Sequence, residues 1–155
     1  MKQYRTKRIA IFAFLAVCVT AFIFWNSTRD AQASRQLSNG VLSFLKPLLL
    51  PLFGDSEELM QQVIRKGAHF VEFAALGGCM YGLASGIRSR FWRHALLFFP
   101  LFMMLSVAVT DEFIQSFSAE RSSVVKDVIL DFGGGVFGLG AASVLSKLLH
   151  RRKKK

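Results

Sequence analysis

Four apolar runs separated by charged segments limit what this chain can fold into. They cover residues 9–25, 68–83, 95–109 and 128–149 of a chain of 155. A helix needs about 20 mostly apolar residues to cross the hydrocarbon core of a membrane, and somewhat shorter runs are tolerated. A soluble protein of this length would have little amphipathic surface left to cover four such helices. We therefore predict an all-α membrane protein, folded as a four-transmembrane-helix bundle.

The predicted bundle is a single membrane domain over residues 9–149, between basic tails at 1–8 and 150–155. Its helices are expected at about 9–25, 67–86, 94–112 and 127–149. The longest connection begins with a segment rich in Ser, Gln and Arg, residues 26–39, which we predict to be a loop. The apolar stretch at 40–53 is too short to span and is interrupted by Pro47 and Pro51. We expect it to be an interfacial or re-entrant segment of the first outer loop.

The distribution of charge predicts how the bundle is oriented. One side of the four-span arrangement carries 13 of the 20 basic residues and none of the ten acidic ones. Those basic residues are Lys2, Arg5, Lys7, Arg8, Arg88, Arg90, Arg93, Lys147, Arg151, Arg152, Lys153, Lys154 and Lys155. Because Lys and Arg beside short loops stay in the cytoplasm, both termini are predicted to be cytoplasmic, in a multi-pass inner-membrane protein. The net charge of +10 does not predict nucleic-acid binding, since no recognition motif accompanies it.

The first apolar run also has some features of a signal peptide, because Ala31-Gln32-Ala33 follows a basic start and an apolar stretch. The run is long, however, and its aromatic end at Trp25 lies well before that Ala-x-Ala sequence. We favour an uncleaved first helix, and cleavage would not change the predicted orientation of the other three.

Small residues recur at every fourth position in two of the predicted helices. Such spacing lets membrane helices approach closely, so that their backbones come into contact. The pattern suits packing within one chain or a homodimer through the Gly-xxx-Gly faces, and both interpretations remain open. The residues are Gly78, Gly82 and Gly86 in the second helix, and Gly134, Gly138 and Ala142 in the fourth.

Ionisable residues at the ends of three predicted spans give the strongest functional signal. Charged groups are costly in a membrane and usually line a cavity or a pathway. In the predicted topology they all lie at the outer ends of their helices, so they would meet at one membrane boundary and form a polar pocket. The predicted site residues are His69, Glu72, Asp111, Glu112, Gln115, Arg121, Asp127 and Asp131.

The chemistry of this predicted pocket is open. Asp127 alone would be a good helix start, and Asp131, inside an apolar run, is the residue that a structural role explains least. Neighbouring carboxylates can divide acid and base roles. His69 with carboxylates could also hold a divalent metal, but no complete ligand set is evident. We therefore predict no metal and no cofactor, and assign no catalytic residue.

The same residues resemble the VanZ-like family of small bacterial integral membrane proteins. Lys66-Gly67-Ala68-His69-Phe70-Val71-Glu72-Phe73 is similar to the family's Lys-x-x-His-Phe-x-Glu-aromatic element. The match continues through Thr110-Asp111-Glu112, Gln115, Arg121, Lys126-Asp127-Val128 and Asp131, with weaker similarity at Asn26-Ser27, Ser34 and Ser38. The family commonly has Pro-Gly-Arg where this chain has Ala119-Glu120-Arg121. The freedom of that glycine is absent here, which weakens any role carried over to Arg121.

The resemblance implies an action in the cell envelope, because the family is named for a member associated with resistance to teicoplanin, a lipoglycopeptide antibiotic. The first hypothesis is a protein that binds a lipid-linked or wall-related ligand at its outer face, with Arg121 meeting the anion. The second is an integral-membrane hydrolase or transferase, with a carboxylate or His69 as general base. A small transporter ranks third, because the polar groups lie at one end only. Whether the protein is an enzyme is left open.

Overall fold

The computed structural model describes residues 2–29, 31–87, 95–117 and 125–152, which form five α-helices and no strand. The helices are α1 Lys2–Ser27, α2 Ala31–Phe53, α3 Glu57–Gly86, α4 Ala95–Gln115 and α5 Val125–Arg152. The prediction of an all-α protein is confirmed. Within the described residues, three helical segments are long and apolar enough to cross a membrane: Gln3–Ser27, Phe98–Gln115 and Val125–Arg151.

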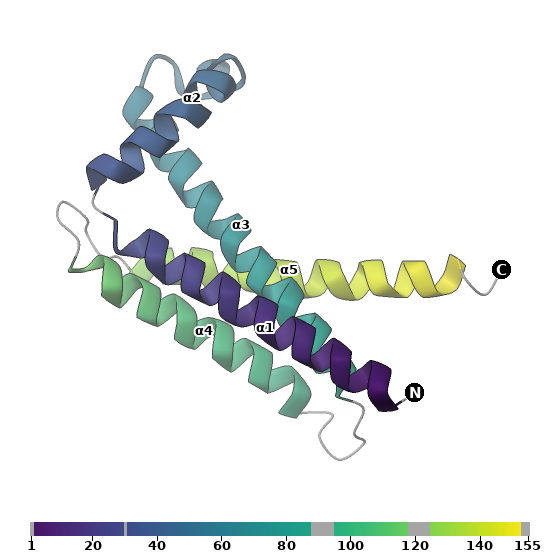
Figure 1. Cartoon of the computed structure of the whole chain (residues 1–155). Helices are drawn as coiled ribbons and strands as arrows, with labels where there is room; N and C mark the ends of the chain where they lie inside the picture. The colour runs from purple at the N-terminus through teal and green to yellow at the C-terminus, as the bar shows by residue number, and fades with distance from the viewer. Residues whose placement is uncertain (1, 30, 88–94, 118–124, 153–155) are drawn as a thin grey trace.

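Helix α3 is the centre of the structure and packs against each of the other four helices (Figure 1). It runs antiparallel to α1. The Arg5 Nε atom donates to the carbonyl of Gly86 over 2.8 Å, whereas near the other end Asn26 Nδ2 donates to Glu72 Oε1 over 3.0 Å. A hydrogen bond from Ser27 to Asp111 joins the last turn of α1 to the last turns of α4. Helices α1 and α4 therefore run in the same direction, opposite to α3.

Glycines bring α3 and α5 into backbone contact. Gly134 lies against the backbone of Phe70, and one turn later Gly138 lies against that of Ala74. A Cβ at position 134 would lie 2.5 Å from the Phe70 carbonyl oxygen. Because contacts advance along both helices together, α5 runs parallel to α3. This close approach is the packing that small residues permit between apolar helices, where dispersion and weak hydrogen bonds hold the pair.

The glycines at the other end of α3 receive side chains from α1. Gly82 lies against the ring of Phe12, and Gly86 against the side chain of Ile9. A Cβ added at Gly78, by contrast, would meet nothing within 4 Å in the described part of the chain, apart from its own helix backbone. Four of the predicted small-residue positions thus serve packing between helices of one chain.

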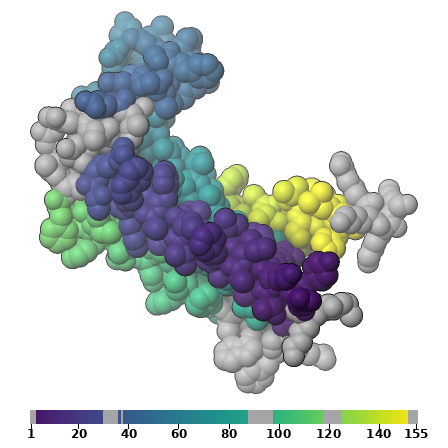
Figure 2. Space-filling model, viewed as in Figure 1, coloured from purple at the N-terminus to yellow at the C-terminus, as the bar shows by residue number. Residues whose placement is uncertain are grey.

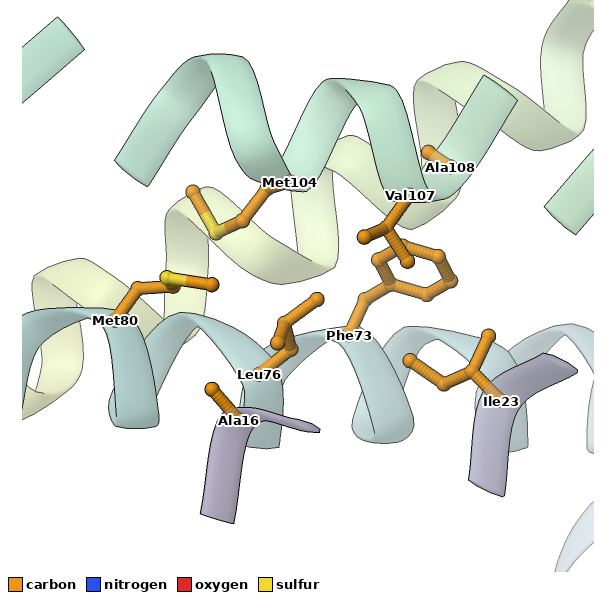
Figure 3. Close-up of a cluster of buried hydrophobic side chains, with 8 residues drawn as sticks. All are labelled: Ala16, Ile23, Phe73, Leu76, Met80, Met104, Val107 and Ala108. Carbon is orange, nitrogen blue, oxygen red and sulfur yellow. The ribbon is translucent and has the colours of Figure 1, made fainter. Parts of the chain in front are cut away.

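The buried apolar core lies between α1, α3 and α4. In Figure 3 the ring of Phe73 points toward Val107 of α4, and the thioether of Met80 faces that of Met104. The outer surface is apolar as well: Phe14, Phe102 and Phe137 are each more than 60% exposed. Apolar side chains on both the inside and the outside are expected of helices surrounded by lipid, because lipid tails are as apolar as the core.

The predicted loop over residues 26–39 is wrong, since residues 26 and 27 complete α1 and residues 31–39 begin α2. The segment contains Ala, Gln, Arg and Leu, which have high helix propensity, and this outweighs its Ser residues. It is also held against α3 by a 2.8 Å hydrogen bond from Gln61 to Asn39. The helix continues past both prolines and ends at Phe53; the next residue, Gly54, has a φ of 60°, which suits the position after a helix C-terminus.

Helix α3 begins ten residues before the predicted second span, at Glu57. Two acidic residues in its first turn stabilise the start of the helix, and Glu57 Oε1 lies 2.5 Å from Lys46 Nζ of α2. The hydrogen bond and charge of Lys46 lower the pKa of Glu57, and Glu57 in turn raises the pKa of Lys46. The pair therefore joins α2 to α3 while Glu57 is ionised, and its contribution is lost as the pH falls through the lowered pKa.

Helix α2 stands apart from the rest of the bundle. Among the described residues it packs against α3 alone, and with the start of α3 it forms a separate lobe in Figure 2. Its Leu42 side chain is buried, whereas four other apolar side chains form an exposed stripe at helical spacing. These are Val41, Phe44, Leu48 and Leu52.

Candidate functional site

His69 is buried in the middle of α3, with carboxylates on two sides. Its Nδ1 atom lies 3.9 Å from Glu72 Oε2, one turn along the same helix. The same nitrogen lies 3.8 Å from Oδ2 of Asp111 on α4. Asp111 is completely buried and His69 is 7% exposed. Two predicted site residues from different helices thus meet away from water.

Hydrogen bonds from α1 and α4 hold the two carboxylates in place. Asn26 donates to Glu72 Oε1, and the hydroxyl of Ser27 donates to Asp111 Oδ1. Gln115 Nε2 donates to Asp111 Oδ2 over 2.7 Å. Glu72 is therefore held by an amide of α1, and Asp111 is held by a hydroxyl of α1 and by an amide one turn along its own helix. These hydrogen bonds give the site a defined geometry.

Helix α5 contributes Asp131, which is 2% exposed. One ligand-type atom each from His69, Asp111 and Asp131 lie within 4.8 Å of one another. Asp131 also interacts electrostatically with Glu72 and with Glu112, which is 4% exposed. Three helices thus bring together one imidazole and four carboxyl groups, which we call the polar cluster: His69, Glu72, Asp111, Glu112 and Asp131.

The polar cluster contains the His, Asp and Glu positions on which the family resemblance was based, except Asp127. The sequence profile of the VanZ/LLP1 family matches residues 12–146, which is most of the chain. The chain belongs to the VanZ/LLP1 family. Comparison with curated proteins and with solved structures found no match. Family membership and the apolar helices together make this a VanZ-like membrane protein.

Three of the eight residues predicted for the site of this VanZ/LLP1 protein are not part of the polar cluster. Gln115 contacts the polar cluster through Asp111. Asp127 lies at the start of α5, where its Oδ1 atom is 2.6 Å from Lys66 Nζ in an ion pair that is partly exposed. Asp127 thus has a structural partner outside the cluster. Arg121 lies outside the described residues.

A cavity of about 210 Å³ opens between α1, α2 and α3 beside the polar cluster. One part of its wall is apolar, and the rest carries polar and charged groups. His69 and Glu72 belong to both the cavity and the cluster. The lining residues are Phe22, Asn26, Ser38, Val41, Ile64, Arg65, Ala68, His69 and Glu72.

Sequence reasoning missed the contributions of Asn26, Ser27 and Arg65. The first two were noted only in a Ser-rich segment predicted to be a loop, although they end α1 and donate to buried carboxylates. The sequence did contain a signal for these two residues. They follow the first apolar run directly, at the membrane boundary where the acidic residues were predicted to lie. Arg65 carried none, because its position at the cavity depends on how α2 folds back on α3.

The buried carboxyl groups define what the polar cluster can do. Burying a carboxylate in apolar surroundings is costly unless a proton, a cation or a metal offsets its charge. Closely spaced carboxyl groups around an imidazole can therefore share protons, bind a cation or pass a proton to a bound molecule. Pairing of His69 with an aspartate would also fix the orientation of the ring.

Proposed function

We propose that this protein crosses the bacterial inner membrane four times, with both termini in the cytoplasm. Helix α3 would be the second of the four spans, because it runs opposite to α1 and α4 and parallel to α5, as alternating crossings require. Helix α2 would lie in the outer interface, with the exposed side chains of Phe44, Leu48 and Leu52 facing lipid. This proposal puts the polar cluster at the outer boundary, and the basic helix ends in the cytoplasm.

Reporter fusions test this topology. A cytoplasmic reporter fused after residue 155 should be active, whereas one inserted at Gly54 should be inactive; an exported reporter should give the reverse pattern. Activity of the same reporter at both positions would contradict four crossings with α2 outside.

We also propose that the cavity binds an anionic, lipid-linked ligand of the cell envelope. The proposal rests on the two kinds of surface in the cavity wall, one charged or polar and one apolar. Arg65 offers a guanidinium suited to phosphate or carboxylate, while Phe22, Val41 and Ile64 offer an apolar surface suited to a lipid tail. Asn26, Ser38 and Glu72 could position hydroxyl and amide groups of the ligand between them. Binding of this kind would support tolerance to teicoplanin by engaging the wall precursors on which the drug acts.

Arg65→Gln should weaken binding of a polyprenyl-diphosphate-linked wall precursor by about tenfold or more, because a hydrogen bond to a charged group contributes about 1.5–3 kcal/mol. The measurement is a titration of purified protein in lipid nanodiscs. Lys126→Gln is the matched control, since it removes the same charge from an exposed position that does not line the cavity. Equal affinity of wild type and Arg65→Gln would contradict the proposal. In a teicoplanin-sensitive host, wild-type protein should protect and Arg65→Gln should protect less.

An integral-membrane hydrolase or transferase is the second candidate, favoured by the approach of His69 to Asp111. An imidazole oriented by a carboxylate is a common general base. A transporter is less well supported, because the described core away from the polar cluster is apolar, with Ala16, Leu76 and Met80 buried there. A homodimer through the glycine faces stays a prediction. Of the three α3 glycines predicted for these faces, Gly78 is the one at which an added Cβ meets no described residue within 4 Å.

A further inference from the structure

We propose that the polar cluster binds one divalent metal ion, with His69, Asp111 and Asp131 as protein ligands. The proposal goes beyond ligand binding in the cavity and does not depend on it. One ligand-type atom from each of the three residues lies within 4.8 Å of the other two. Ligand atoms about 2.0–2.2 Å from a shared ion lie at most about 4.4 Å apart, so small side-chain movements would complete the site.

Asp131 provides the independent observation that points to a ligand. Asp131 lies in the apolar part of α5 and is only 2% exposed, and one of its carboxylate oxygens lies within 4.8 Å of a ligand-type atom of His69 and of Asp111. Within the described parts of the chain, no hydrogen bond or ion pair to Asp131 is found, although its neighbours are acidic. A carboxylate in such a position has a large desolvation cost, which coordination to a cation would offset.

Glu72 supplies a candidate fourth ligand. Its Oε1 atom accepts a hydrogen bond from Asn26, whereas its buried Oε2 atom accepts none from the described residues and lies 3.9 Å from His69 Nδ1. Asn26 thereby orients the carboxylate so that Oε2 faces the imidazole. Supporting hydrogen bonds of this kind, like those from Ser27 and Gln115 to Asp111, are typical of residues around metal ligands.

The donor set indicates the class of metal. One imidazole with two or three carboxylates suits Zn²⁺ or Mn²⁺ better than Mg²⁺ or Ca²⁺, which prefer oxygen alone, or Cu⁺, which prefers sulfur. Because His69 also lines the cavity, an ion held here would lie just behind the cavity wall. The sequence predicted no metal because these ligands come from three helices and follow no local spacing rule.

Direct titration with metal alone tests the proposal. Full-length protein without a histidine tag is purified in detergent, treated with a chelator, and titrated with Zn²⁺ and with Mn²⁺ by calorimetry; Co²⁺ absorbance reports the ligand geometry. We expect one ion per chain and a higher thermal unfolding temperature with metal. Asp131→Asn, which keeps the side-chain shape, should lower the affinity at least tenfold, because even the outer partners of metal ligands contribute about 10- to 100-fold.

Glu58→Gln is the matched control, since Glu58 is an exposed acidic residue of α3 outside the polar cluster. It should bind metal as the wild type does. The proposal is overturned if folded wild-type protein binds no ion at millimolar metal, or if Asp131→Asn binds and is stabilised as strongly as wild type. Should Asp131→Asn fail to fold, the wild-type stoichiometry and the loss of the Co²⁺ spectrum in His69→Gln decide the question.

Discussion

Replacing Gly138 by valine should leave almost no folded protein. A Cβ at this position would overlap the carbonyl group of Ala74, which is backbone in the middle of α3 and cannot move aside as a side chain can. Relief requires α3 and α5 to separate along their shared contact, and even side-chain overpacking costs about 1–3 kcal/mol. We expect loss of the monodisperse peak in size-exclusion chromatography, or a much lower thermal unfolding temperature.

Gly140→Val is the control for this prediction. Gly140 lies on the same helix, two residues away. A Cβ added there would meet nothing within 4 Å among the described residues, apart from its own helix backbone. Both changes introduce the same β-branched residue into α5, so helix propensity cannot separate them. Gly140→Val should behave as wild type. If the two variants were equally stable, the contact between α3 and α5 would not be the one described.

Asp111→Leu should strongly destabilise the protein, whereas Asp111→Asn should fold normally. Leucine removes the acceptor of the hydrogen bonds from Ser27 and Gln115 at a completely buried position. Each such loss costs about 1–3 kcal/mol. Asparagine has the same shape, can donate to the Ser27 hydroxyl and can still accept from Gln115. Thermal unfolding of the two purified variants checks this difference.

The folded Asp111→Asn variant then separates the two candidate functions. Asp111 does not line the cavity, so precursor binding should stay within about tenfold of wild type if the protein is a binding protein. A hydrolase or transferase that uses the His69–Asp111 pair should instead lose activity by about 10²- to 10⁴-fold. Loss of teicoplanin protection in this variant with precursor binding unchanged would favour the enzyme.

The helical fold and the site residues differ in how far the sequence predicts them. Helix α5 was predicted within a few residues, because the apolar run is long and its limits are set by Asp127 and by the basic tail. Helix α2 was not, because Ser and Gln suit a loop as well as a helix, and its packing on α3 decides between them. The sequence placed Asp127 and Asp131 in one pocket. In the structure Asp127 forms a partly exposed ion pair with Lys66, whereas Asp131 is buried in the polar cluster.

The sequence by itself determined that the chain is helical, that its helices suit a membrane, and that His and acidic residues are placed near the ends of those helices. Apolar runs and charges are local properties, so spacing along the chain is enough to reveal them. Only the tertiary structure decided that Asn26 and Ser27 hold the carboxylates, that Arg65 faces the cavity, and that His69, Asp111 and Asp131 come within metal-binding distance. These contacts join different helices, and they depend on helix direction and on the close approach of α3 and α5, which no local pattern specifies.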